Sequence, residues 1–172
     1  MTDSHDAYLV DDLDLALLTA LREHPRIGDL ELSRVVKVAR ATVQSRLRRL
    51  QEAGVIASWS PTVDAARAGF GVQAFVTLEI AQGALDGVAA GLAEIPQVLE
   101  AYVTTGSADV LCRIATSSHA ELQDTLVRLN TSPMVVRSTS VMVLSTLVEP
   151  RTLPLLATGQ GATTSRAPAY RR

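Results

Sequence analysis

The sequence predicts an α+β protein in two parts, a helical part followed by a part built on one β-sheet. Apolar residues recur every three or four positions up to Leu50, and from Val72 onward they alternate with polar ones, which marks a change from helix to strand. The stretch 34–51 holds six cations and no Asp or Glu. From Val72 the patterns follow in the order strand, helix, strand, strand, helix, strand, which predicts a ferredoxin-like sheet.

Composition limits the class of protein. The 172 residues are 47% apolar and 20% charged, which is typical of a globular chain that forms one large domain or two small ones. No run of about 18 uncharged apolar residues occurs, so we expect no membrane span. The first six residues are acidic in balance and lack the pattern of a secretory signal, so we expect a cytoplasmic protein.

The sequence contains no constellation typical of an enzyme. A single cysteine, Cys112, excludes an internal disulfide and argues against a cysteine-based metal site. The three histidines are scattered along the chain, and no Ser/His/Asp, Walker or dinucleotide motif occurs. We therefore expect no catalytic residues, no metal and no cofactor.

Three helices are expected before residue 60. Acidic residues at Asp11 and Asp12 precede an apolar helical repeat that Pro25 ends. Asp29 is the candidate cap of a second, short helix. The stripe that this helix is expected to bury consists of Leu32, Val35 and Val36. A break near Lys37 then leads into the basic helix.

The basic helix has an apolar back and a polar front. Ala39, Val43, Leu47 and Leu50 share one stripe, and Arg, Gln, Ser and Thr side chains face the other way. Arg can bind guanine, Gln can bind adenine, and hydroxyl groups can reach phosphates or bases. A charged face can also simply face water, but three helices with a tight turn before the third predict a DNA-binding helix-turn-helix. The candidate DNA-binding residues are Arg34, Arg40, Thr42, Gln44, Ser45, Arg46, Arg48 and Arg49.

The segment after the basic helix extends the motif. Gly54 is expected to end the helix, and residues 55–60 form a short β segment where a wing would lie. The run 13–56, with Arg-Leu-Arg-Arg-Leu-Gln-Glu-Ala-Gly-Val-Ile at its end, resembles the winged helix-turn-helix of the Lrp/AsnC (feast/famine) transcriptional regulators. That family usually has Gly in the tight turn and Ser as the cap of the third helix, where this chain has Lys37 and Ala39. A missing cap costs about 1 kcal/mol, so the start of the helix is expected to fray until a phosphate docks there.

The second part of the chain alternates strands and helices. A capping box at Ser118 and Glu121 is expected to open its second helix. The strands are expected at 72–80, 98–105, 109–116 and 135–148, and the helices between residues 85 and 95 and from 118 to about 130.

The last strand bears on assembly. Val141 and Val143 point to one side of the sheet, and Met142 and Leu144 point to the other. Two helices cover only one face of a sheet, whereas an antiparallel sheet with one solvated face should alternate apolar with polar residues. A second copy of the chain is the simplest cover for the other face, and a strand with a few tolerated surface aliphatics is the alternative.

The turn at 104–109 is a candidate ligand site. Glycine frees backbone amides to meet a carboxylate, and Asp109 is placed to accept an ammonium group, although Gly-Ser-Ala-Asp is also a good hairpin turn by composition alone. The resemblance to Lrp/AsnC proteins, which bind amino-acid effectors in this loop, favours the ligand site. The candidate effector-binding residues are Thr104, Thr105, Gly106 and Asp109, with Ser138 and Thr139 completing the pocket from a neighbour.

The expected organisation is a flexible N-terminus (1–10), a winged helix-turn-helix DNA-binding domain (11–60), a linker (61–71), a ferredoxin-like effector-binding and oligomerisation domain (72–150) and a flexible C-terminal tail (151–172). The resemblance, which covers about 11–149, implies a non-enzymatic, sequence-specific transcriptional regulator of double-stranded DNA, responding to a small amino-acid-like effector bound between dimers. It implies a homodimer that assembles into a tetramer or octamer, in the cytoplasm and at the nucleoid when bound to DNA. The alternatives are a tetrapyrrole (sirohaem-type) decarboxylase of the same architecture and a ligand-binding scaffold with a vestigial DNA-binding domain.

Overall fold

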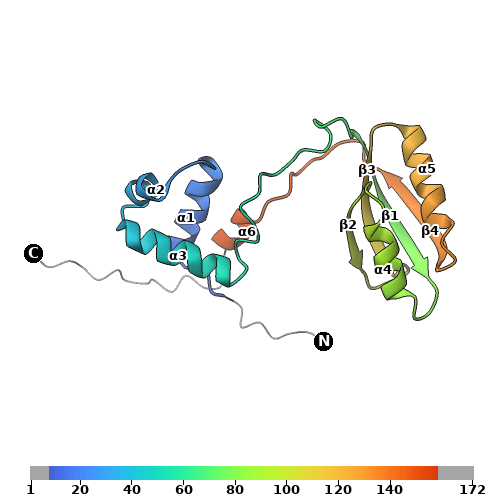
Figure 1. The fold of residues 1–172 in the computed structure, drawn as a ribbon, viewed down its shortest axis with the longest axis horizontal. Helices are drawn as coiled ribbons and strands as arrows, with labels where there is room; N and C mark the ends of the chain where they lie inside the picture. The colour runs from blue at the N-terminus through green and yellow to red at the C-terminus, as the bar shows by residue number, and fades with distance from the viewer. Residues whose placement is uncertain (1–7, 159–172) are drawn as a thin grey trace, which may run out of the picture. The chain divides into compact units, whose positions relative to one another are not determined.

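The computed structural model describes residues 8–158, and these residues separate into two units (Figure 1). The helical unit contains the chain up to Ser60 together with the segment from Glu149, and the sheet unit runs from Pro61 to Val148. The parts of the two expected tails at 1–7 and 159–172 lie outside the described residues. None of the helices within 8–158 has the length and apolar character that crossing a membrane requires.

The helical unit is built on three helices, α1 (Asp12–Glu23), α2 (Asp29–Val35) and α3 (Arg40–Glu52). Helix α1 begins with a capping box, in which the Asp11 carboxylate accepts from the Asp14 backbone N–H at 2.9 Å and the Asp14 carboxylate accepts from the Asp11 N–H. Leu17, Leu32 and Val43, one from each helix, are fully or almost fully buried against one another. The predicted helix-turn-helix is therefore formed.

Helix α2 differs from its prediction in two details. Its N-cap is Gly28, which offers no side-chain cap, and Asp29 is the first helical residue. An acid in the first turn still interacts favourably with the helix dipole. Leu32 and Val36 pack in the core, but Val35 is exposed, because a helix of seven residues buries only a narrow stripe.

The tight turn between α2 and α3 is closed by Lys37. This residue has a φ of +56°, the left-handed conformation that glycine adopts most easily. Beyond the turn the Val38 N–H donates to the Ser33 carbonyl oxygen at 3.1 Å. Ala39 is the N-cap of α3 and makes no side-chain capping bond, as the sequence predicts.

The expected β segment at 55–60 has no strand pairing in the described chain. The Ile56 N–H donates to the Leu50 carbonyl oxygen at 3.1 Å, so the chain folds back on the end of α3 before it continues. Trp59 is more than half exposed, and its indole Nε1–H donates to the Gln51 side chain at 3.2 Å. The wing segment is thus anchored to α3 by side-chain and turn contacts.

The C-terminal segment returns to the helical unit. A short helix, α6 (Leu153–Ala157), packs against α1. A flexible tail was expected from residue 151, so the prediction is wrong for α6. The sequence Leu-Pro-Leu-Leu-Ala has Pro near the helix start, where its missing N–H leaves no bond unmade, and leucines that supply an apolar side.

The sheet unit has four strands, β1 (Val72–Ile80), β2 (Val98–Val103), β3 (Val110–Thr116) and β4 (Val135–Met142). They form one antiparallel sheet in the order β2-β3-β1-β4, the ferredoxin-like topology. Helices α4 (Leu85–Ala93) and α5 (His119–Asn130) cover one face (Figure 1). On that face the core contains Ala74, Val76, Leu78, Val110, Cys112 and Ile114 from the sheet with Val88, Leu92, Leu122 and Leu129 from the helices.

The last strand is shorter than predicted. Strand β4 ends at Met142, and one further bond, from the Val143 N–H to the Gln73 carbonyl oxygen at 2.9 Å, prolongs the pairing. Leu144 and Leu147 beyond it are almost fully exposed. The pairing stops here because its neighbour β1 begins at Val72 and offers no further backbone partners.

Candidate nucleic-acid interface and effector loop

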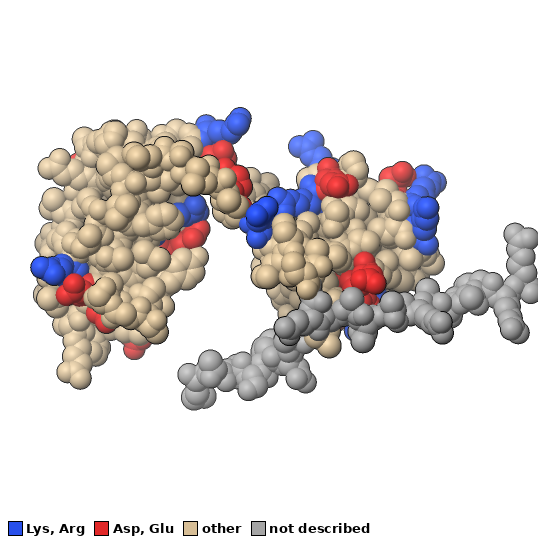
Figure 2. Space-filling model, turned by 180° about the vertical axis from the view of Figure 1, so that it is seen from behind, with Lys and Arg blue, Asp and Glu red and all other residues tan. Residues whose placement is uncertain are grey.

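The outward side of α3 carries hydrogen-bonding side chains. Val43 and Leu50 are buried beneath the helix, whereas Arg40, Gln44, Ser45, Arg48 and Arg49 are exposed and Thr42 is half-buried. Figure 2 shows Lys and Arg side chains together with Asp and Glu side chains on the visible faces of both units. Most of the predicted residues of α3 thus lie on its solvent side.

Several of these side chains form hydrogen bonds or ion pairs with other exposed side chains. Gln44 Nε2 donates to Asp29 Oδ2 at 2.9 Å. Arg48 and Glu52 are 3.8 Å apart, and Arg34 pairs with Glu31 at 2.9 Å one turn away on α2. Exposed pairs of this kind contribute about 0–1 kcal/mol. They orient the side chains of α3 without preventing them from exchanging to phosphate or base atoms.

Arg46 is the exception among the predicted DNA-binding residues. Its side chain is 17% exposed and turns toward α1, where Nη1 pairs with Asp11 Oδ2 and with Asp14 Oδ1 at 3.2 Å. Asp14 is fully buried. The structure therefore places Arg46 in an internal ion-pair network that fixes α3 on α1. A sequence signal for this existed, because Arg46 follows Val43 by three residues and so shares the inward side of the helix.

Tyr8 is a member of the same network that the sequence did not indicate. Its hydroxyl donates to Asp14 Oδ2 at 2.9 Å, and the Arg49 guanidinium lies 5.6 Å from the centre of its ring. Burial and the hydrogen bond to Asp14 raise the pKa of Tyr8. Burial acts to raise the pKa of Asp11 as well, but the Asp14 N–H and the Arg46 guanidinium outweigh it and lower that pKa.

The predicted effector loop joins β2 to β3. Gly106 has a φ of +116°, so the turn needs glycine at this position. The Thr104 hydroxyl donates to the Ala108 carbonyl oxygen and its N–H to the Asp109 carbonyl oxygen, both at 2.9 Å. Thr104 therefore stabilises the loop internally, and Thr105 and Gly106 are exposed at its tip.

Asp109 ties the loop to the neighbouring strand. Its Oδ2 accepts from the Ile80 N–H at 2.8 Å, and its own N–H donates to the Leu78 carbonyl oxygen at 2.9 Å. The carboxylate that was expected to accept an ammonium group thus has one oxygen occupied by the backbone. The other oxygen retains accepting capacity, because an ionised carboxylate can accept about four hydrogen bonds.

Ser138 and Thr139 lie on β4, which two strands separate from β2. They are consecutive strand residues, so they point to opposite faces: Ser138 is opposite Leu78 on the helix-covered face, and Thr139 is opposite Thr77 on the open face. One subunit does not bring both of them to the loop.

The sheet face that carries no helix exposes apolar side chains. Phe75, Tyr102 and Val141, at 42%, 54% and 63% exposure, lie on it together with an ion pair between Arg113 and Glu100 at 2.6 Å. The Tyr102 hydroxyl donates to Glu100 at 2.9 Å, and Arg113 Nε is buried without a hydrogen-bond partner in the described chain. This open face is the one that sequence alternation predicted to be apolar.

The described residues show no group of three or more potential metal ligands. Cys112 is buried in the sheet core, and burial raises the pKa of its thiol to about 11, which keeps it protonated and unreactive.

Comparison with known proteins agrees with this geometry. Residues 10–57 match the winged helix-turn-helix DNA-binding family model, and residues 73–153 match the Lrp/AsnC ligand binding domain. The transcriptional regulator FL11 of Pyrococcus horikoshii is 30% identical over 146 residues, 85% of this chain and 97% of FL11. The regulator Rv2324 of Mycobacterium tuberculosis is 31% identical over 142 residues, 81% of this chain and 95% of Rv2324.

Solved structures show the same fold. Escherichia coli AsnC superimposes with a TM-score of 0.79 at 26% identity, covering 86% of this chain and all of AsnC. The regulator NMB0573 of Neisseria meningitidis, solved as a complex with L-Met, gives 0.76 at 26% identity over 84% of this chain and 96% of its own. The winged helix-turn-helix, the ferredoxin-like sheet unit and these relatives together show that the chain belongs to the Lrp/AsnC family of DNA-binding transcriptional regulators.

Proposed function

We propose that this protein is a sequence-specific regulator of transcription that inserts α3 into the major groove of double-stranded DNA. The observation that supports this proposal most strongly is that the arginines of α3 lie in different environments. Arg46 locks the helix to the buried Asp14, and Arg40 and Arg48 on the outward side remain in solvent. A rigidly held helix with a hydrogen-bonding front can read base edges, because its backbone needs little ordering on binding.

The proposed contacts divide by chemistry. Gln44 and Arg48 lie one turn apart on the front of α3 and are proposed to read bases, and Arg34 on α2 with Arg40 at the start of α3 to bind phosphates. Thr42, Ser45 and Arg49 flank this line. Arg46 is left out of the proposed contacts because its guanidinium is engaged within the protein.

The open face of the sheet supports a homodimer. Phe75 and Val141 are opposite each other on β1 and β4, and Tyr102 lies on the edge strand β2, so this face exposes large apolar side chains on three strands beside the Arg113–Glu100 ion pair. A two-fold dimer would carry two copies of α3, and two such helices read half-sites about 34 Å apart, one turn of B-DNA. Further association into a tetramer or octamer would place the 104–109 loops of neighbouring dimers together.

The effector is proposed to be a small amino acid bound at the 104–109 loop between dimers. The exposed amides at Thr105 and Gly106 suit a carboxylate, and the free oxygen of Asp109 suits an ammonium group. Two related structures carry an amino acid: NMB0573 with L-Met, and Rv3291c of M. tuberculosis, solved with L-methionine, which is 28% identical with a TM-score of 0.73 over 83% of this chain and 97% of its own. As a regulator of this kind the protein would act in the cytoplasm and at the nucleoid.

The DNA proposal is tested by selecting preferred sequences from a random duplex pool and then titrating the selected duplex at several salt concentrations. Several phosphate contacts per subunit predict a linear fall of log affinity with log salt, at a slope of about −0.9 per phosphate. Arg48→Ala should weaken binding, while Arg67→Ala, which removes one exposed cation from the sheet unit, should leave it unchanged. A flat salt response or no enriched sequence would refute the proposal.

The effector proposal is tested separately by a thermal-shift screen of the twenty amino acids, because a ligand of the native state raises the melting temperature. Asp109→Asn keeps an oxygen for the Ile80 N–H and removes the charge that an ammonium group needs. The variant should therefore retain the fold and lose the shift. A shift that survives in Asp109→Asn would place the amino acid elsewhere.

A further inference from the structure

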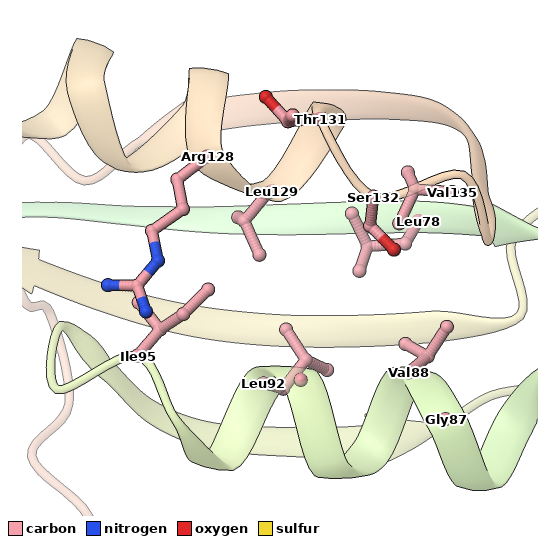
Figure 3. A pocket seen from close by; sticks show the side chains of 11 residues that line it. Leu78, Gly87, Val88, Leu92, Ile95, Arg128, Leu129, Thr131, Ser132 and Val135 are labelled. Atoms are coloured by element: carbon pink, nitrogen blue, oxygen red, sulfur yellow. The ribbon is translucent and has the colours of Figure 1, made fainter.

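A cavity of about 400 Å³ lies between α4 and α5 on the helix-covered face of the sheet (Figure 3). This volume is within the range of about 300–1,000 Å³ that small-molecule sites occupy. The cavity is part of neither the α3 surface nor the 104–109 loop. Its walls are aliphatic and come from the sheet, from both helices and from the segment after α4: Leu78, Val88, Leu92, Ile95, Leu129 and Val135.

Two glycines of α4, Gly87 and Gly91, border this cavity one helical turn apart. At Gly87 an added Cβ would lie 2.5 Å from Met134 Sδ, so packing explains that glycine. At Gly91 an added Cβ would meet no atom within 4 Å. Glycine inside a helix costs about 1 kcal/mol relative to alanine, and no close contact demands it at Gly91. The glycine instead keeps one wall of the cavity open.

The polar side of the cavity is cationic. Arg128 reaches from α5 across the end of the cavity beside Ile95, and its Nη2 donates to the Glu94 carbonyl oxygen at 3.2 Å (Figure 3). A guanidinium has five N–H donors, so this single bond orients the group and leaves donors for a ligand. Thr131 and Ser132 border the cavity toward its other end, near Val135, and the Thr131 hydroxyl donates to the Val127 carbonyl oxygen at 2.8 Å (Figure 3). No Asp or Glu is among the described lining residues.

We propose that this cavity binds a small branched aliphatic carboxylate that lacks an ammonium group, of the 2-oxo acid class. The carboxylate pairs with Arg128, and the alkyl group lies between Leu92 and Leu129. An amino acid fits less well, because its ammonium group, one carbon from the carboxylate, would lie near the Arg128 guanidinium with no Asp or Glu among the described lining residues to offset the repulsion. The chemistry is therefore complementary to that of the 104–109 loop, where Asp109 offers a carboxylate. The inference does not depend on DNA binding.

Filling the cavity is the first test. Binding of 4-methyl-2-oxopentanoate to the full chain is measured by titration calorimetry for the native protein, for Gly91→Leu and for Ala89→Leu. Gly91→Leu adds a side chain at a residue that lines the cavity, and we expect this side chain to fill part of it, while the control adds the same side chain at an exposed residue of the same helix that does not line the cavity. We expect native-like binding by Ala89→Leu and at least about tenfold weaker binding by Gly91→Leu, with a melting temperature no lower than native because Leu is the better helix former. Undiminished binding by folded Gly91→Leu, or no binding by the native protein at millimolar ligand, would overturn the proposal.

The charge is tested by Arg128→Gln. Loss of a charge-assisted hydrogen bond should weaken 2-oxo acid binding about tenfold or more, while the affinity for the neutral analogue 4-methylpentan-2-one should not change. Leucine serves as the second probe. If leucine binds at the 104–109 loop, Gly91→Leu should leave its affinity unchanged. That result would support a carboxylate without an ammonium group as the ligand of the cavity. Leucine that competes with the 2-oxo acid at equal affinity and is displaced by Gly91→Leu would contradict it, as would an unchanged 2-oxo acid affinity in Arg128→Gln.

Discussion

Replacing Arg46 by Met tests whether this arginine holds the structure together or contacts DNA. Met keeps the apolar stem and removes the cation. Asp14, fully buried, would then keep only Tyr8 and the Asp11 N–H as partners. Removing one partner of a buried pair costs about 3–5 kcal/mol. Because Arg46 is 17% exposed and water can partly replace it, we expect about 2–3 kcal/mol here.

The assay is thermal unfolding followed by circular dichroism at 222 nm. For a domain of this size each kcal/mol corresponds to about 4–8 °C, so the helical unit of Arg46→Met should melt at least about 8 °C lower than the native unit. Arg48→Met is the matched control, because Arg48 lies on the same helix with 71% of its side chain exposed. Its stability should change by no more than about 0.5 kcal/mol.

DNA binding then separates the two roles. Below its melting temperature Arg46→Met should keep the native salt dependence, and Arg48→Met should lose about 1–3 kcal/mol of affinity if it reads a base. The reasoning is refuted by the opposite pattern, in which Arg46→Met melts like the native protein and reduces the slope of log affinity against log salt by about 1, as loss of a phosphate contact would.

Three further outcomes follow from the helical unit. Ala39→Ser should raise the melting temperature in the same assay, because a hydroxyl at this extended N-cap is worth about 1 kcal/mol, and no change would show that the start of α3 needs no cap. Lys37→Gly should also stabilise, by less than about 1 kcal/mol, because glycine adopts the positive φ without strain but has more conformational entropy to lose on folding. The lowered pKa of Asp11 means that its carboxylate stabilises the fold above its unfolded pKa of about 3.8 and that this contribution is lost as pH falls through the lower folded value. Asp11→Asn should therefore flatten the dependence of stability on pH in the acid range below the unfolded pKa, and an unchanged profile would argue against the shift.

Periodicity predicted most of the fold because the core is simple. The alternation from Val72 and the spacing of Val88 and Leu92 identify elements that bury one side each, so the β-α-β-β-α-β order followed without knowledge of contacts. Local patterns failed where long-range packing decides. The end of β4 depends on where β1 begins. Helix α6 packs against α1, whose last residue precedes it by 130 positions in the sequence.

The candidate sites could be proposed from the sequence, but the contacts of their individual residues could not. A cationic helix front was visible in the sequence, but Arg46 has the same charge as its neighbours and differs only in facing Asp14. The partner of Asp109 is the backbone of Ile80, which no side-chain pattern announces. The sequence did not indicate the cavity beside Gly91. A glycine within a helical repeat signals only a position of low helix propensity and does not indicate a cavity.

The return of the chain to α1 makes the helical unit discontinuous in sequence. Residues 61–148 are in effect inserted between the main body of that unit and α6. A fragment that stops at Ser60 would expose the side of α1 against which α6 packs. The isolated helical unit should therefore be made by joining residue 60 to residue 149 through a short flexible spacer. The inserted unit is joined covalently to the helical unit at both of its ends, at residues 60–61 and 148–149. A rearrangement of the inserted unit can therefore act on the helical unit through two connections.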